Sequence, residues 1–268
     1  MEVSGLLDAA ALGVIEGLTE FLPVSSTGHI LLAEHFLGFE SRSAVFEIVI
    51  QLGAILAVVA LYFRRLARVA LDFPTKTEAR YFVFTVLAAF MPVVVLGALL
   101  HGFIKEVLFA SPGLIAGMLI AGGVVMLLVE RLPKREIITD PERLPLRTAV
   151  GIGLFQCISM IPGVSRSGAT IIGGMLLGVS RKAAAEFSFF LSIPTMVGAS
   201  TFDLYKNHAA LDSHDLTLIL VGFGTAFLSA LVVVQGFIGF ISRHGLTPFA
   251  WYRIALGTVM LVALALGW

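Results

Sequence analysis

Long apolar runs alternate with short polar segments along most of the chain. Six of these runs approach the roughly 20 residues that a helix needs to cross the hydrocarbon core of a bilayer. We therefore expect six transmembrane helices. The runs cover residues 46–63, 81–101, 112–129, 185–204, 215–240 and 248–267.

Two further apolar stretches, residues 5–38 and 148–179, are interrupted in the middle. The interruptions read "FLPVSSTGH" and "IPGVSRSGAT", and their Pro, Gly and hydroxyl residues end a helix. Irregular backbone at membrane depth is stable only where protein or a water-filled cavity satisfies its polar groups. We expect two re-entrant, broken-helix hairpins that the spanning helices enclose.

The two halves of the chain resemble one another when one is shifted by 140 residues. The shift superposes Gly13 on Gly153, Glu16 on Gln156, Ser25 on Ser165, Thr27 on Ser167, Gly28 on Gly168, and Leu37 and Gly38 on Leu177 and Gly178. A half with one hairpin and three crossings forces the other half to lie upside down, as in many transporters. This predicts an all-α polytopic membrane protein with an inverted-topology repeat. The expected organisation is one domain over residues 1–268, with repeats at about 1–130 and 148–268 joined by a cytoplasmic loop over 130–147.

Composition supports a membrane protein and argues against a nucleic-acid partner. The chain is 58% hydrophobic and 13% charged, and its formal net charge is zero, so it lacks the basic field of a nucleic-acid binder. Lys and Arg concentrate in segments 64–80 and 130–147, with five in each. The excess of Lys and Arg in cytoplasmic loops places both segments inside and both termini outside. The hairpins then enter from opposite faces, and their tips are expected to meet within the membrane.

The first hairpin carries a pair of acidic residues, Glu16 and Glu20, four positions apart. On a helix their carboxylates share one face and can hold a hard divalent cation through oxygen ligands. The alternative is two solvated glutamates, which an intramembrane position disfavours because unpaired carboxylates there are costly.

Both interruptions have the features of an anion site. Hydroxyls and free N–H groups gather where a helix begins, and the helix dipole favours an anion there. The second interruption adds Arg166, whose planar fork can bind a phosphate through two hydrogen bonds. Simple helix capping is the alternative for the hydroxyls, and it leaves Arg166 unexplained.

Further polar positions have open interpretations. His29 can serve as base, acid or orienting partner of a hydroxyl nucleophile, or as a hydrogen-bonded core residue. Glu47, Gln51 and Glu186 are expected to line the same cavity, although Glu186 can equally extend toward the interface. Arg253 is interpreted as an anchor at the inner interface.

The motifs "EGLTEFLPVSSTGH" at 16–29 and "PGVSRSGAT" at 162–170 resemble those of the bacterial undecaprenyl-diphosphate phosphatases of the bacitracin-resistance type. The resemblance extends over the chain, including "FEIVIQLGAILAV" at 46–58 and "YRIALG" at 252–257. It implies removal of the terminal phosphate of undecaprenyl diphosphate, which recycles the lipid carrier of cell-wall synthesis. It also implies assistance by Mg²⁺ or Ca²⁺ and a site in the bacterial inner membrane that opens toward the periplasmic face.

The resemblance assigns roles to residues of both motifs. The expected catalytic residues are Glu16, Glu20, Ser26, His29 and Arg166, with Glu16 and Glu20 as cation ligands. The expected substrate-binding residues are Ser25, Thr27, Gly28, Gly163, Ser165, Ser167, Gly168 and Thr170. The nucleophile stays open between Ser26, Ser25 and a metal-activated water.

A transporter or flippase of a phosphorylated lipid or anion is the main alternative, because inverted repeats with broken helices are typical of alternating access. The acidic pair and His29 favour hydrolysis, since a carrier needs neither base nor nucleophile. A channel fits less well without rings of charged residues. Gly113 and Gly117 suit close helix contact, either within the chain or in a homodimer.

Overall fold

The computed structural model describes residues 3–37, 45–103, 111–133, 136–207 and 215–267. Over these ranges the regular structure is helical, apart from an isolated bridge between Ile138 and Val179. The all-α prediction is confirmed.

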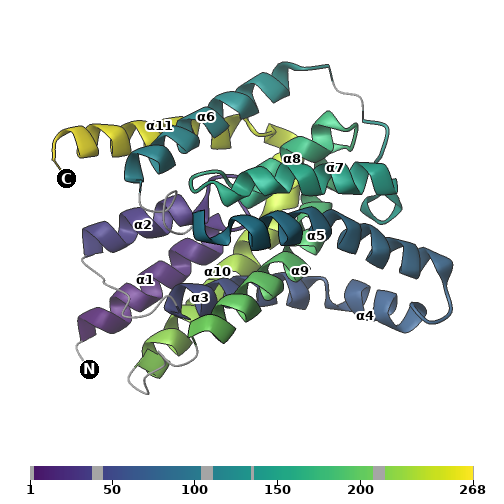
Figure 1. Ribbon diagram of the computed structural model, residues 1–268, viewed down its shortest axis with the longest axis horizontal. Coiled ribbons are helices and arrows are strands. Elements are labelled where there is room, and N and C mark those ends of the chain that lie inside the picture. Colours follow the sequence, from purple (N-terminus) through teal and green to yellow (C-terminus); the bar gives the residue numbers. More distant parts are fainter. Residues whose placement is uncertain (1–2, 38–44, 104–110, 134–135, 208–214, 268) are drawn as a thin grey trace.

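Each of the six expected apolar runs falls on a helix, and each expected hairpin is two helices separated by a break (Figure 1). The helices are α1 (Val3–Thr19), α2 (Ser26–Leu37), α3 (Val45–Leu61), α4 (Phe63–Asp72), α5 (Thr77–Phe103), α6 (Pro112–Arg131), α7 (Leu146–Cys157), α8 (Arg166–Leu176), α9 (Arg181–Asn207), α10 (Asp215–His244) and α11 (Thr247–Ala265), with short 3-10 turns η2 (Pro141–Arg143) and η3 (Ile158–Met160).

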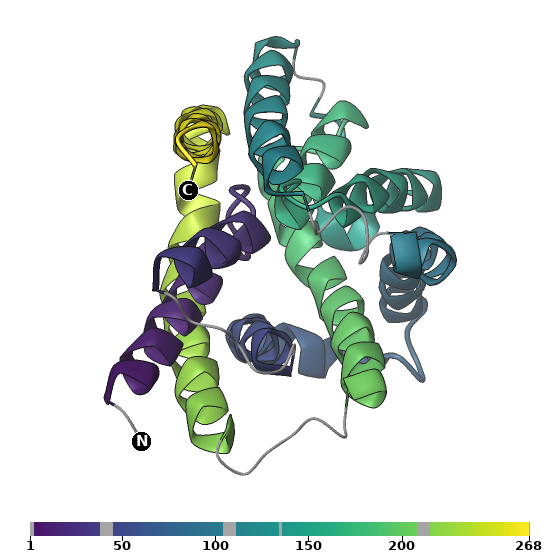
Figure 2. The ribbon, with the colours of Figure 1, turned by 60° about the vertical axis from the view of Figure 1, so that its left-hand side comes forward.

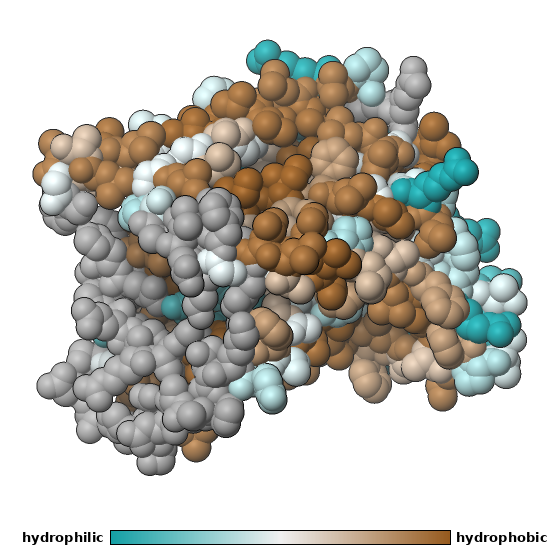
Figure 3. Space-filling model, in the orientation of Figure 1, coloured by the Kyte–Doolittle hydropathy of each residue, from teal (hydrophilic) through white to brown (hydrophobic). Residues whose placement is uncertain are grey.

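Within the described ranges, α5, α6, α10 and α11 are long and apolar enough to cross a membrane. A fifth span results if α3 and α4, which meet at a bend of 72°, count as one. Helix α9 has 27 residues but is less apolar, because charged residues near its two ends and serines such as Ser188 and Ser192 interrupt its apolar sequence. Much of the face in Figure 3 is hydrophobic. The exposed apolar surface and the long apolar helices together identify the chain as a multi-pass membrane protein.

The helices of the two halves correspond in sequence and in packing. Helices α2 and α8 begin 140 residues apart, at Ser26 and Arg166. Helix α1 packs on α10 as α7 packs on α5, while α3 contacts α9 and α6 contacts α11 (Figures 1 and 2). The counterparts are α1 and α7, α3 and α9, α5 and α10, and α6 and α11. Exchanging each helix for its counterpart therefore preserves these contacts.

The positively charged segments lie at one end of the molecule, away from the two chain ends (Figure 1). Arg65 of α4 binds Glu142 of η2 at 2.5 Å and Glu186 of α9 at 3.0 Å, which joins the two segments directly. Of the two interpretations of Glu186, the structure favours the one that directs it toward the basic end, because its carboxylate is paired with Arg65 and it does not line the cavity between the hairpins.

Enclosure of the hairpins is uneven. In α8, every residue from Ser167 to Gly174 is buried. Helices α1 and α7 expose an apolar face, with Val14 and Leu18 on α1 and Val150 and Leu154 on α7. The expected enclosure therefore holds for α8 and is wrong for α1 and α7. An apolar outer face suits contact with lipid, since helical backbone needs no partner there.

Candidate active site

The tips of the two hairpins meet, as expected from the sequence. Ser167 donates from its hydroxyl to the carbonyl oxygen of Leu22 at 2.7 Å, and Ser165 approaches the same oxygen at 3.4 Å. Gly163 has φ of +88°, a left-handed turn that a side chain would strain. Ser165 then caps α8, where its hydroxyl accepts from the N–H of Gly168 at 3.1 Å.

Arg253 of α11 ties both tips together from one side. Its guanidinium donates to the carbonyl oxygens of Pro23 at 3.2 Å and Gly163 at 2.9 Å, and also to Met118 and Leu119 of α6. The side chain is only 1% exposed. The interpretation of Arg253 as an interface anchor is therefore wrong: four carbonyl oxygens satisfy a buried guanidinium that would otherwise be costly.

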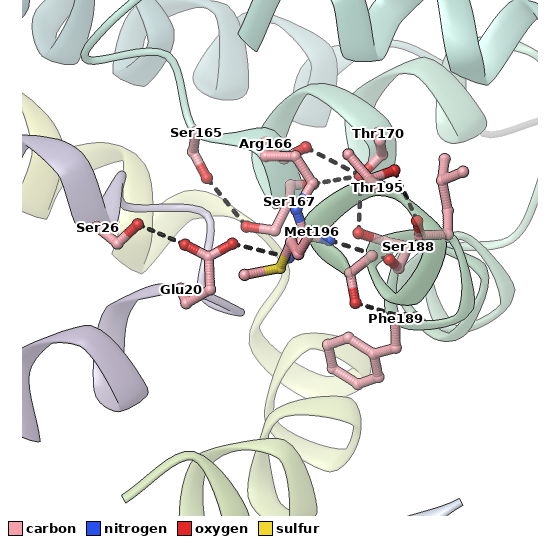
Figure 4. Close-up of polar contacts among 12 residues, drawn as sticks. Glu20, Ser26, Ser165, Arg166, Ser167, Thr170, Ser188, Phe189, Thr195 and Met196 are labelled. Carbon is pink, nitrogen blue, oxygen red and sulfur yellow. Dashed lines mark hydrogen bonds and ion pairs between the residues drawn. The ribbon is translucent and has the colours of Figure 1, made fainter. Parts of the chain in front are cut away.

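Arg166, the first residue of α8, points into the junction between the hairpins (Figure 4). Its Nη2 donates to Glu20 Oε1 at 3.0 Å, and its Nη1 donates to the carbonyl oxygen of Ser188 at 3.0 Å. The guanidinium carbon lies 5.7 Å from the ring centroid of Phe21, a cation–π contact. Its Nε has no partner among the described residues, so the guanidinium retains a donor.

Glu20 lies between this arginine and a serine. Its Oε2 accepts from the hydroxyl of Ser26, the first residue of α2, at 2.5 Å (Figure 4). Both residues are buried. The carboxylate is thus placed to accept the proton of this hydroxyl, and Ser26 is the serine of the first tip with a base at hydrogen-bond distance.

His29 turns away from Ser26. Its Nδ1 lies 2.7 Å from the carbonyl oxygen of Ser25, and its Nε2 lies 2.7 Å from the Tyr252 hydroxyl. The expected contact between this imidazole and the nucleophile is replaced by the contact between Ser26 and Glu20. Tyr252 and Arg253, neighbours in sequence, therefore both reach the tip of the first hairpin.

A cavity of about 170 Å³ lies at the junction and holds part of the expected set. Its lining comprises Glu20, Ser25, Ser26, Thr27, Gln51, Ser159, Val164, Ser165, Arg166, Thr195, Met196 and Ala199. The expectation for Gln51 is confirmed. Ser159 and Thr195 had not been expected there; the only sequence signal is that Thr195 follows Pro194, a proline inside α9.

Five of the expected substrate-binding residues do not line this cavity: Gly28, Gly163, Ser167, Gly168 and Thr170. They lie in the two tips and in the helices α2 and α8 that begin there, outside the lining of the cavity. The Thr170 hydroxyl, for example, is fully buried and lies 2.7 Å from the Ser188 hydroxyl and 3.0 Å from the carbonyl oxygen of Arg166. Thr170 thereby fastens α8 to α9 behind Arg166.

Glu16 is, with Glu20, one of the two expected ligands of a divalent cation. The residue is 4% exposed, its Oε1 has no partner among the described residues, and it interacts electrostatically with Glu20, Glu47 and Arg166. No group of three or more His, Cys, Asp or Glu in the described ranges is placed to hold a metal. A closed protein cage does not fit these residues. A Mg²⁺-like ion does fit, because it commonly takes one or two carboxylates and completes its shell with substrate phosphate and water.

The fold and site define a helical, multi-pass membrane protein with a hydroxyl-lined pocket between two broken hairpins that contains a paired arginine and glutamate. The chain belongs to the family described as bacitracin resistance protein BacA, which matches residues 9–259. It is 56% identical to "Undecaprenyl-diphosphatase 1" of Mesorhizobium japonicum over 264 residues, 98% of each chain. It is also 56% identical to "Undecaprenyl-diphosphatase" of Paracoccus denitrificans over 260 residues, 97% of each chain. The resemblance seen in the motifs is confirmed.

Proposed function

We propose that the protein is an undecaprenyl-diphosphate phosphatase, which hydrolyses undecaprenyl diphosphate to undecaprenyl phosphate and inorganic phosphate. The observation that carries the proposal is the chain of contacts from Ser26 to Glu20 to Arg166. It joins a hydroxyl nucleophile, a base and an anion-binding guanidinium in one pocket. The names of relatives that match nearly the whole chain support the same activity.

Binding of the diphosphate begins with a change of partner at Arg166. A phosphate competes with Glu20 for Nη2 and gains the donor at Nε, so the guanidinium can hold it through two hydrogen bonds. The N–H groups at the start of α2 and α8 add the electrostatic attraction of helix N-termini. Phosphate binding thus frees one oxygen of Glu20.

The chemical step follows from the contact between Ser26 and Glu20. The Ser26 oxygen attacks the terminal phosphorus while Glu20 accepts its proton, and the bond from this phosphorus to the bridging oxygen breaks. Undecaprenyl phosphate leaves with the bridging oxygen. A water then attacks the phosphorus, the bond from phosphorus to the Ser26 oxygen breaks, and the proton held by Glu20 returns to that oxygen as phosphate leaves. Arg166 stabilises charge on the non-bridging oxygens, which is the main requirement of phosphoryl transfer.

A divalent cation, Mg²⁺ or Ca²⁺, would be held by Glu16 and Glu20 together with substrate oxygens. When bound, it supplies further neutralisation of phosphate charge. The buried, unpartnered oxygen of Glu16 is the feature that supports this assignment.

The topology proposed with this function is six crossings and two re-entrant hairpins in an inverted repeat within the bacterial inner membrane. The correspondence of helix pairs between the halves and the shared end of the two basic segments support it. With basic segments inside, the Ser26 side of the pocket opens toward the periplasmic face.

The experiment that tests the function is a paired assay of the purified protein. Phosphate release from undecaprenyl diphosphate is measured in detergent, and transfer of a phosphorylated lipid across the bilayer is measured in liposomes. We expect phosphate release from the wild type and from Ser242→Ala, whose serine is on the exposed end of α10, and none from Ser26→Ala. Lipid transfer by a wild type that releases no phosphate would replace the hydrolase by the transporter.

A further inference from the structure

Ser25 at the tip of the first hairpin has an unusual backbone. Its φ of 71° makes it the one non-glycine residue with positive φ in the described part of the chain. This left-handed conformation is unfavourable for a residue with a side chain and persists only where its surroundings hold it. Ser26, the residue that contacts Glu20, follows immediately. Whatever holds Ser25 therefore also sets the position of the Ser26 hydroxyl.

The imidazole of His29 is placed to hold Ser25. The first hydrogen bond of α2 would run from the His29 N–H to the carbonyl oxygen of Ser25, but it is long, at 3.4 Å. The His29 Nδ1 atom approaches the same oxygen at 2.7 Å. The side chain thus makes the short contact that the backbone does not.

The second hairpin provides an internal comparison. A shift of 140 residues superposes Ser25 on Ser165 and His29 on Ala169. There the Ala169 N–H donates to the carbonyl oxygen of Ser165 at 2.9 Å, with φ of −68° at Ser165. An ordinary backbone bond suffices where the serine is unstrained. The imidazole is found where the serine is left-handed.

The two partners of His29 determine which ring nitrogen carries the proton. A carbonyl oxygen can only accept, so Nδ1 must donate to Ser25. In the neutral ring Nε2 is then the acceptor, and the Tyr252 hydroxyl donates to it at 2.7 Å. The two rings also stack, with centroids 5.5 Å apart and planes within 7°. Tyr252 thereby fixes the tautomer and the orientation of the imidazole.

We propose that His29 is a positioning residue, which clamps the left-handed Ser25 through its Nδ1–H and so holds the Ser26 hydroxyl on Glu20, with Tyr252 as its orienting partner. It carries no proton to or from the substrate. Two observations support this role: both ring nitrogens are engaged, and His29 is not among the residues that line the cavity. The inference rests on the proposed function, because its effect is measured as turnover.

A pair of amide substitutions separates positioning from proton transfer. In His29→Asn the amide nitrogen can occupy the place of Nδ1 and still donate to Ser25, whereas the longer amide of His29→Gln reaches the place of Nε2. We expect His29→Asn to keep kcat within about tenfold of wild type. His29→Gln and His29→Ala should lose about 10²-fold, the scale of an ångström-level misplacement in an active site. Tyr252→Phe should fall between His29→Asn and His29→Ala, because it loses only the lock on the tautomer.

Two control measurements make the outcomes interpretable. Thermal unfolding in detergent checks that the variants are folded, and His29→Asn measured across pH should keep the limbs of the wild-type profile. The positioning role is wrong if folded His29→Asn is as inactive as His29→Ala, or if the pH–rate profile of His29→Asn loses a limb that the wild type has. It is also wrong if His29→Ala retains full activity. A wild type that releases no phosphate would count against the proposed function instead. The positioning role would then be tested by thermal stability: His29→Asn should be as stable as the wild type, and His29→Ala should be less stable.

Discussion

Glu20 and Arg166 lie 146 positions apart in the chain and bind one another at 3.0 Å where the two hairpins meet. Each neutralises the other in a place where either charge alone would be costly. In the proposed mechanism, the pair also keeps the Arg166 guanidinium occupied until an anion of higher charge competes with Glu20 for it. The site is therefore assembled by the contact between halves, and neither hairpin contains it alone.

Substitution of Arg166 tests the anion-binding role. Arg166→Ala should lose on the order of 10³-fold in kcat/KM, the upper range for loss of one charge-stabilising group. Arg166→Lys should also be severely impaired, because an ammonium cannot bind Glu20 and the Ser188 carbonyl with the same fork.

The measurement is phosphate release at saturating and at low substrate. Because Arg166→Ala leaves Glu20 buried without its partner, thermal unfolding in detergent checks that this variant is folded. Turnover of Arg166→Ala at the wild-type rate would remove this residue from the mechanism.

Substitution of Arg253 should reduce stability and activity, because this residue holds the two hairpin tips in place. Lysine cannot reach all four carbonyl oxygens, and each lost hydrogen bond from a charged donor costs about 1.5–3 kcal/mol. Arg253→Lys should therefore lower the free energy of unfolding and kcat together, with KM changed less.

The matched control is Arg131→Lys at the exposed end of α6, expected within about 0.5 kcal/mol of wild type. Thermal unfolding and turnover are measured on the same preparations. Wild-type stability of Arg253→Lys would show that the four contacts do not hold the tips.

Cation dependence tests Glu16. If its free carboxylate oxygen contributes to the cation site, Glu16→Gln should raise the Mg²⁺ concentration for half-maximal activity by about tenfold or more, because an amide is a weaker ligand. A chelator should abolish wild-type activity, and added Mg²⁺ or Ca²⁺ should restore it. Full activity in excess chelator would exclude the cation.

The orientation in the membrane is tested by labelling of cysteines in intact cells. In a Cys157→Ala background, cysteines at Thr75 and Thr139 should be protected from an impermeant thiol reagent, since both lie in the basic segments. A cysteine at Ser213, which lies outside the described residues, should react. The reverse pattern would place the pocket on the cytoplasmic face.

The sequence predicted the breaks in the hairpins because their causes are local. Pro23 and Gly163 disrupt a helix wherever they occur, and Ser165 caps the helix that follows. The meeting of the tips also followed from the repeat. The partners of charged groups were harder to predict, because Glu20 contacts Arg166 only through the packing of distant helices. Sequence spacing alone suggested Glu16 as the residue that acts together with Glu20.

Arg253 illustrates the same limit. A charge near the start of an apolar helix is equally compatible with an interfacial anchor and with a buried clamp. The helix face that packs on α6 decides between them, and that face is a property of the fold. His29 was visible as a candidate, but its role depended on a backbone angle at Ser25 that no sequence pattern indicates.

Separation of binding from turnover at the contact between Ser26 and Glu20 is the most direct test of the proposed mechanism. Phosphate release and binding of a non-hydrolysable prenyl diphosphate analogue are measured for wild type, Glu20→Gln and Ser26→Ala. We predict a loss of turnover of about 10²–10⁴-fold in Glu20→Gln, as expected when an acid–base group is removed. Ser26→Ala should show none, and both should bind the analogue within about tenfold of wild type. Substantial phosphate release by Ser26→Ala, with Glu20→Gln unimpaired, would contradict the central claim.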